Sequence, residues 1–294
     1  MTEDKLQFYL VDAISPEPFS GCGTALVEAA RVPHRGRRLK LARALGQPVC
    51  GFYSTNGQKL QVEWYSPERP VKNSLTGLAA AVSLLAERPE PVEVEAEGQD
   101  FVQLQVEKRE GHRCGVSLSV KQIEFAPFRY SRDLLAGALG LDRYTMPDHW
   151  PLWQVGAASW TLVVPVMNVE AMGAVRPDYD SIGRLCRKIG VERCTLYTWQ
   201  GNAEMRLRTF APLRGIFEQP ASAASAIAAA ALAVKEKALP ITPPSTELYV
   251  LQGVETGRTC RCRLIAEHSP AEIRSVELKT EARIAGSGEF FSTG

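Results

Sequence analysis

One stretch without any charged residue constrains the fold of this chain most. Residues 221–234 consist only of alanine, serine, isoleucine, leucine and valine, a composition that favours a helix. Pro220 suits the first turn of that helix, where a missing N–H costs nothing. A helix that is apolar on every side is normally buried, and this one is too short for a membrane span, which requires roughly 20 apolar residues. We therefore expect a helix inside the protein, with N–H groups at its start that favour anions.

The region in front of this helix has a counterpart near the start of the chain. Residues 205–210 form a predicted strand that ends before a turn, and residues 59–65 form another that ends before Pro67. A second apolar helix, residues 76–85, begins behind Ser74. Because strand, proline and helix recur in the same order, an internal duplication is favoured over a chance likeness of two alanine-rich helices.

The duplication sets the expected architecture. The fold class is α+β, with two pseudo-symmetric domains, each a curved and mostly antiparallel sheet around one central buried helix. The length of 294 residues suits two domains, which we place at 1–126 and 127–294; the last strands either belong to the second domain or return to the first. Asn56-Gly57 predicts a tight turn between two strands of the first sheet. The two central helices are expected to face each other, N-terminus to N-terminus, across a cleft.

Composition and charge exclude several classes of protein. Apolar residues make up 45% of the chain and charged residues 23%, a soluble globular profile, and the formal net charge is +1. We therefore expect neither nucleic acid nor membrane as a partner, and we interpret the basic cluster in residues 31–43 as a solvated helix face. The seven cysteines, an odd number, and the polar N-terminus indicate reduced thiols and a cytoplasmic location. The four histidines are scattered and no nucleotide-binding motif is present, so we expect no metal and no cofactor.

Five short motifs occur in an order that matches a known family and cover nearly the whole chain. They are residues 8–21, 64–67, 160–166 with a Pro-Asp pair downstream, 208–216 and 252–258. By these motifs the chain resembles the phenazine-biosynthesis PhzF-like proteins, which share the diaminopimelate epimerase fold. The resemblance implies a homodimer and a cofactor-independent isomerase or epimerase that moves a proton next to a carboxylate. The aromatic stretch 144–153 is a candidate dimer contact, since exposed Trp and Tyr are favoured at interfaces.

The resemblance fails at the positions where the family carries its polar catalytic groups. Val49 stands in place of the family's Glu, Leu75 in place of its His, and Gln219 in place of its Asp. Ala224 replaces a Ser at the start of the second buried helix. Valine and leucine cannot transfer a proton, and a glutamine amide does not titrate in water. This chain is therefore identified as a divergent member without the usual acid and base.

Three residues remain as candidates for chemistry. Cys22 matches a position that faces the substrate in the family, where a thiolate near two helix N-termini would have a lowered pKa; the alternative is a small buried filler. Gln219 would hold the substrate by hydrogen bonding, and Glu218 is either a base or an outward-facing carboxylate of the first helical turn. The expected substrate-binding positions are Val49, Cys50, Asn73, Ser74, Leu75, Thr76, Gly156, Ser222, Ala223 and Ala224.

Two functions of different class follow from these residues. The first is a PhzF-like isomerase, cyclase or dehydratase of secondary metabolism, which holds and polarises a small polar or carboxylate metabolite in the cleft with little proton transfer. The second is an inactive relative that binds a ligand or a partner protein. Loss of the family's acid and base favours the second function, while a polar lining with Gln in place of Asp favours the first.

Overall fold

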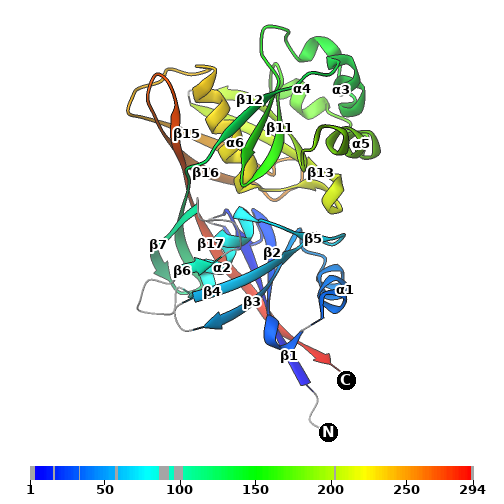
Figure 1. The fold of residues 1–294 in the computed structure, drawn as a ribbon, viewed down its shortest axis with the longest axis vertical. Helices are drawn as coiled ribbons and strands as arrows, with labels where there is room; N and C mark the ends of the chain where they lie inside the picture. The colour runs from blue at the N-terminus through cyan, green and yellow to red at the C-terminus, as the bar shows by residue number, and fades with distance from the viewer. Residues whose placement is uncertain are drawn as a thin grey trace.

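The computed structural model describes most of the chain in two stacked halves (Figure 1). The described ranges are 4–15, 17–32, 34–56, 59–85, 93–95, 102–201 and 203–292. Gly57, and with it the expected Asn56-Gly57 turn, lies outside these ranges. Within them, no helix is long and apolar enough to cross a membrane.

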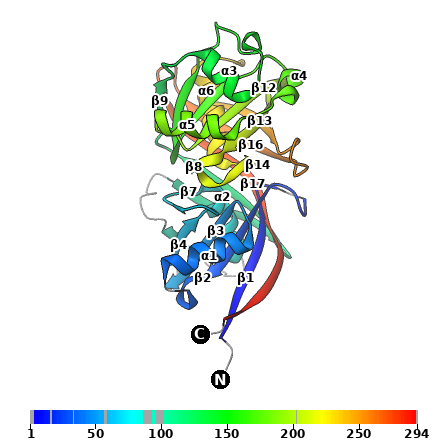
Figure 2. The same ribbon diagram turned by 90° about the vertical axis from the view of Figure 1, so that its right-hand side faces the viewer.

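The first half is a curved sheet around helix α2 (Leu75–Leu85), with helix α1 (Arg35–Leu45) on its outer face (Figure 2). Its strands are β1 (Asp4–Ala13), β2 (Cys22–Glu28), β3 (Val49–Asn56), β4 (Lys59–Tyr65), β5 (Pro70–Val71), β6 (Glu93–Glu95), β7 (Val102–Glu110) and β8 (Arg113–Val120). A 3₁₀ turn, η1 (Ala29–Arg31), leads towards α1. The inner core of this half forms where α2 packs against β1, β2, β3 and β8.

The second half repeats this plan around helix α6 (Ala223–Lys235). Its strands are β9 (Glu124–Pro127), β10 (Trp153–Ala157), β11 (Ser159–Pro165), β12 (Arg193–Gly201), β13 (Glu204–Ala211), β14 (Ile216–Gln219), β15 (Ser245–Gln252), β16 (Cys260–His268) and β17 (Ile273–Ser292). Its remaining helical segments are η2 (Arg143–Thr145), η3 (Pro212–Arg214), α3 (Arg132–Leu139), α4 (Val169–Ala174) and α5 (Tyr179–Ile189). Every residue of α6 from Ala223 to Val234 is buried, as its uncharged composition predicts.

The strand pairings show the duplication directly. In the first half β2 pairs parallel with β3, β3 antiparallel with β4, β4 antiparallel with β5, and β4 parallel with β6. The second half has the same series in β11, β12, β13, β14 and β15. In both series the buried helix follows the short fourth strand. The α+β architecture expected from the two alanine-rich stretches is confirmed.

The last strand, β17, is shared by the two halves. Its first part pairs with β16, its middle with β8, and its end with β1, so the chain finishes beside its own start (Figure 1). Leu278 stands opposite Leu264 on one side and Leu118 on the other. A side-chain contact adds to this connection, because Arg258 donates hydrogen bonds to the carboxylate of Asp12 at 2.7 Å and to other groups of the first half.

Two local expectations differ from the structure. Helix α6 begins at Ala223 rather than at residue 221, because the Ser222 hydroxyl accepts a hydrogen bond from the backbone N–H of Ser225 and so caps the helix. In α1, Arg38 does not belong to a solvated face. Its guanidinium is buried, donates to the carbonyl of Val32 at 2.6 Å and pairs with Glu63 at 2.8 Å.

Candidate functional site

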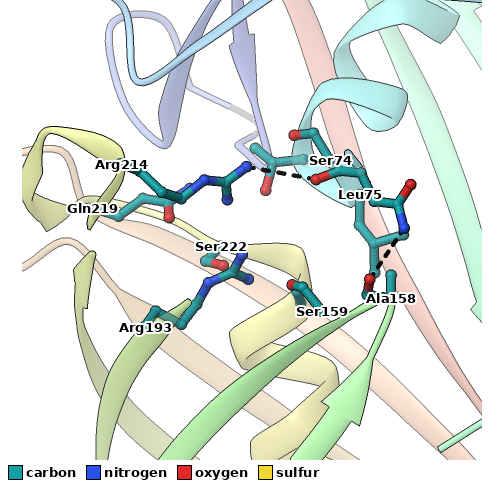
Figure 3. A pocket seen from close by; sticks show the side chains of 11 residues that line it. Ser74, Leu75, Ala158, Ser159, Arg193, Arg214, Gln219 and Ser222 are labelled. Carbon is teal, nitrogen blue, oxygen red and sulfur yellow. Dashed lines mark hydrogen bonds between the residues drawn. The ribbon is translucent and has the colours of Figure 1, made fainter. Parts of the chain in front are cut away.

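A polar pocket lies where the two halves meet (Figure 3). It is lined by Asn73, Ser74, Leu75, Thr76, Ala158, Ser159, Arg193, Arg214, Gln219, Ser222 and Ala224. These residues come from the start of α2, the β10–β11 turn, the start of β12, the end of η3, the end of β14 and the start of α6. The free volume of ≈ 10 Å³ is about the space that one water molecule requires. The pocket is therefore closed in this structure.

The N-termini of α2 and α6 meet at this pocket. The Ser74 hydroxyl accepts the backbone N–H of Gly77 at 3.0 Å and caps α2. The backbone N–H of Ala223, in the first turn of α6, donates to the Thr76 hydroxyl at 3.1 Å. Because both helices point their positive ends here, the pocket favours negative charge.

Two buried arginines add formal positive charge to the same pocket. The side chains of Arg193 and Arg214 point into the space between the two halves (Figure 3), and these residues are 2% and 3% exposed. They share one carboxylate, that of Glu192, with N···O distances of 3.4 Å from Arg193 and 3.7 Å from Arg214. Burial and the neighbouring guanidinium lower the pKa of Arg214 to about 9, and burial also lowers the pKa of Arg193. Because desolvation is the largest cause of both shifts, each guanidinium would be stabilised by a bound anion.

A third arginine approaches from the first half. Arg69 pairs with Glu192 at 3.6 Å and donates to the backbone carbonyl of Leu213 at 3.1 Å. Arg214 in turn donates to the carbonyl of Asn73 at 3.5 Å, a long hydrogen bond across the halves. Glu192 is thus paired with three guanidinium groups.

Cys22 lies behind the pocket rather than on its surface. Its sulfur accepts a hydrogen bond from Gln219 Nε2 at 3.8 Å, and its thiol donates to the carbonyl of Gly23 at 3.7 Å. Full burial raises the pKa of the thiol to about 11, although Gln219, Arg258 and Arg214 act in the opposite direction. The expected lowering of this pKa is therefore wrong, because desolvation outweighs the positive groups nearby.

Seven of the expected site residues line the pocket. They are Asn73, Ser74, Leu75, Thr76, Gln219, Ser222 and Ala224. Ala223 contributes its backbone N–H to Thr76 at the edge of the pocket. Val49 packs in the inner core of the first half, and Gly156 sits on β10 against Trp160.

Cys50 and Glu218 lie away from the pocket. Cys50 faces the opposite side of its sheet, in the core under α1, and burial raises its pKa to about 12. Glu218 makes two hydrogen bonds of 2.8 Å with the guanidinium of Arg208. Neither residue is among those that line the pocket. The alternation of side chains along a strand explains both positions, since each is one residue away from a position that faces inward.

Four residues that line the pocket were not predicted from the sequence. They are Ala158, Ser159, Arg193 and Arg214. For Arg214 a signal existed, because it lies in the turn before the short segment that leads into a helix N-terminus, which favours anions. Arg193 gives no such signal, since nothing in the sequence indicates that the start of its strand lies beside that turn.

Comparison with known proteins identifies the family. The sequence model of the PhzC-PhzF family, described as phenazine biosynthesis-like protein, matches residues 11–289. The chain belongs to this family. Its resemblance to PhzF-like proteins, read from short motifs, is thereby confirmed.

Individual PhzF-like relatives agree with the fold. An uncharacterized isomerase of Deinococcus radiodurans is 27% identical over 154 residues, a match that spans 52% of this chain and only 50% of the relative. A PhzF-family protein of Bacillus anthracis has a crystal structure that superimposes with a TM-score of 0.84 at 18% identity, covering 98% of this chain and 100% of that one. A predicted epimerase of Pseudomonas aeruginosa gives 0.82 at 19% identity, with coverage of 98% and 100%. The fold is therefore that of PhzF-like and epimerase-type enzymes.

We also searched the described residues of this PhzF-like chain for side chains that could bind a metal ion. Among them, no group of three or more His, Cys, Asp or Glu side chains is arranged to hold a metal ion. The charged groups lining the pocket are the two arginines, which repel cations.

Proposed function

We propose that the pocket between the halves binds a small polar or carboxylate metabolite and that the protein isomerises, cyclises or dehydrates it there. The family description, phenazine biosynthesis-like, supports a place in the biosynthesis of a secondary metabolite. The observation that carries the proposal is the convergence of two buried arginines and two helix N-termini on one closed pocket. Such donors stabilise negative charge that develops on a bound substrate.

The chemistry would use positioning rather than a protein base. The motif resemblance matches Val49, Leu75 and Gln219 to the family's acid and base positions, and none of these side chains titrates. Cys22 is protonated at neutral pH, because its pKa is raised to about 11. A rearrangement or ring closure internal to the substrate requires orientation and stabilisation of charge, and both can be supplied by fixed N–H and guanidinium groups.

A second candidate function is ligand binding without turnover. The neutral residues at the acid and base positions favour it, since each removes a proton-transfer group while the polar lining remains. In that case a bound ligand would part the two halves, and this change would signal its presence to a partner protein.

One experiment separates these functions. The protein is incubated with a panel of small hydroxy, keto and aryl carboxylates in deuterated water, and binding, conversion and deuterium content are followed by NMR and mass spectrometry. Conversion without deuterium at carbon supports the positioning mechanism, and binding without conversion supports the second candidate. Deuterium incorporation at carbon would contradict the mechanism, because it requires a protein base that the pocket lacks. Absence of binding to every carboxylate would overturn both candidates.

A further inference from the structure

Four side chains that line the pocket carry a buried polar atom without a hydrogen-bond partner. These atoms are Asn73 Oδ1, Gln219 Oε1, Arg193 Nε and Arg214 Nε. Buried polar atoms are normally paired, so a group of four around one pocket indicates a missing ligand. Two of the atoms are acceptors and two are donors. Arg214 Nε already faces the Glu192 carboxylate at 3.7 Å, so the two amide oxygens and Arg193 Nε describe the chemistry of that ligand.

The acceptor end of Asn73 is fixed by its neighbour. Its Nδ2 donates to the backbone carbonyl of Ala158 at 3.2 Å. Because a carbonyl oxygen can only accept, the amide cannot be turned round without placing two oxygens against each other. Oδ1 is therefore the end left without a partner.

The acceptor end of Gln219 is fixed by Cys22. The single thiol hydrogen of Cys22 is directed at the carbonyl of Gly23, 3.7 Å away. The sulfur is then free to accept, and Gln219 Nε2 lies 3.8 Å from it. Gln219 Oε1 consequently remains without a donor. By this argument Cys22 is a positioning residue that orients the Gln219 amide.

The charge around the pocket determines whether the hydrogen-bond donor of the ligand is an ammonium group or a hydroxyl group. Arg69, Arg193 and Arg214 surround the single carboxylate of Glu192, which leaves a surplus of positive charge. An ammonium group on the ligand would be repelled by these guanidinium groups, whereas a hydroxyl group carries no charge. The ligand therefore needs a carboxylate for the arginines and a neutral hydroxyl whose single hydrogen pairs with one of the amide oxygens, that of Gln219.

We propose, on the basis of the function proposed above, that the pocket selects a small 2-hydroxycarboxylate over the corresponding amino acid and over the plain carboxylic acid. Arg193 and Arg214 hold the carboxylate, and Gln219 Oε1 accepts the single hydrogen of the hydroxyl. The free volume of ≈ 10 Å³ requires the halves to part slightly on binding. The long Arg214–Asn73 hydrogen bond of 3.5 Å crosses the halves beside the pocket and would break when they part.

Glycolate, glycine and acetate form a matched set of probes, because they differ only in the group on the second carbon. Their affinities for the full chain are measured by calorimetry at neutral pH. Glycolate should bind at least about tenfold more tightly than acetate, which leaves the Gln219 amide oxygen unpaired. It should also bind more tightly than glycine, whose ammonium meets the surplus positive charge.

Two variants test the assignment of the residues. Gln219→Glu places a carboxylate where the amide oxygen was, so the ratio of glycolate to glycine affinity should fall by at least about tenfold. Arg214→Met should weaken binding of both glycolate and acetate, while Arg184→Met, on the exposed face of α5, should leave binding unchanged. If Arg214→Met fails to fold by circular dichroism, the fall in the glycolate-to-glycine affinity ratio expected for Gln219→Glu decides.

The outcomes separate this inference from the function on which it rests. If glycine binds as tightly as glycolate or more tightly, or if acetate binds as tightly as glycolate, the hydroxy-acid assignment is overturned. The proposal that the pocket binds carboxylates is not affected by these results. Unaltered selectivity in Gln219→Glu also overturns the assignment. If none of the three probes binds, and the wider panel of carboxylates fails as well, the proposed function itself is overturned.

Discussion

At the scale of single residues, burial rather than residue type decides what chemistry is possible. Cys22 and Arg214 both have functional groups that are reactive or charged in water. Burial raises the pKa of Cys22 to about 11 and lowers the pKa of Arg214 to about 9. The cysteine is thereby made inert at neutral pH, while the arginine gains a strong preference for an anionic partner.

The same effect predicts how stability depends on pH. The pKa of Cys50 is raised to about 12 from 9.0 by burial. Below pH 9 the thiol is neutral in both states, whereas between pH 9 and pH 12 only the unfolded thiol ionises. The free energy of unfolding should therefore fall with rising pH across this window, by up to about 1.4 kcal/mol per pH unit from this residue.

Urea unfolding of wild type and Cys50→Ala, at a mildly basic pH and at one inside the window, measures this dependence. The variant should be less stable at the lower pH because it leaves a small cavity, yet lose less stability as the pH rises. A parallel loss in both proteins would show that Cys50 is not the group responsible.

The sequence predicted the small polar residues of the site better than its charged residues. Asn73, Ser74, Thr76 and Ser222 were found because the family resemblance places the starts of both apolar helices at the cleft. Arg214 was missed because its inward direction depends on the turn and on Glu192, which comes from a different segment. The lowered pKa expected for Cys22 failed because burial cannot be read from a single position.

At the scale of elements, glycines within helices show which helices are closely packed against their neighbours. A Cβ added to Gly77, in α2, would lie 2.4 Å from the ring of Trp64. A Cβ added to Gly137, in α3, would meet nothing within 4 Å. Gly77 is therefore required by the approach of the Trp64 ring, while Gly137 only lowers helix propensity.

We predict opposite effects of the same substitution at these two sites. Gly77→Ala should destabilise the protein by about 1–3 kcal/mol, because the indole has to move within a filled core. Gly137→Ala should stabilise it by roughly 0.5–1 kcal/mol through helix propensity and reduced freedom of the unfolded chain. Thermal unfolding of the two variants gives the sign directly, and a stable Gly77→Ala protein would mean that the core around α2 is loosely packed.

Elements were predictable where composition and capping agree. The uncharged run of α6 and the Ser caps of α2 and α6 are local signals, and both helices were placed within two residues of their observed starts. The path of β17 was not predictable in the same way. Its three partners lie far apart in the sequence, and only tertiary structure brings them together.

At the scale of the whole molecule, one surface is suited to a second copy of the chain. Tyr144 and Met167 are 81% and 50% exposed, and the N–H of Met167 donates to the carbonyl of Thr145 at 2.9 Å, which holds them on one face. We predict a homodimer that uses this face, since exposed aromatic residues and methionine are enriched at interfaces. Light scattering at micromolar concentration should give twice the 32.3 kDa of the chain.

The Tyr144→Glu variant should shift the mass to that of a monomer with unchanged circular dichroism. Leu134→Glu, which changes another exposed apolar side chain, serves as the control and should remain dimeric. A monomeric wild type would refute the prediction, and a dimeric Tyr144→Glu would move the interface elsewhere.

The two halves share a core as well as a strand, and this predicts how they unfold. A single cluster of buried apolar residues includes side chains of both halves, and Leu278 on β17 lies within it, fully buried between β16 and β8. Leu278→Ala should cost about 2–5 kcal/mol, since it leaves a cavity where the halves join. Because the cavity faces strands of both halves, protection from amide hydrogen exchange should fall by the same free energy in β8 and in β16.

Leu139→Ala is the matched control, because Leu139 is also fully buried but belongs to the separate cluster under α3 and α5. Exchange measured by mass spectrometry on peptides from each half compares the two variants. If the halves unfold as one unit, Leu139→Ala also lowers the protection of the slowest-exchanging amides equally in both halves. Loss of protection in the second half alone after Leu278→Ala would show that β17 does not couple them, and that the pocket between the halves opens independently of global stability.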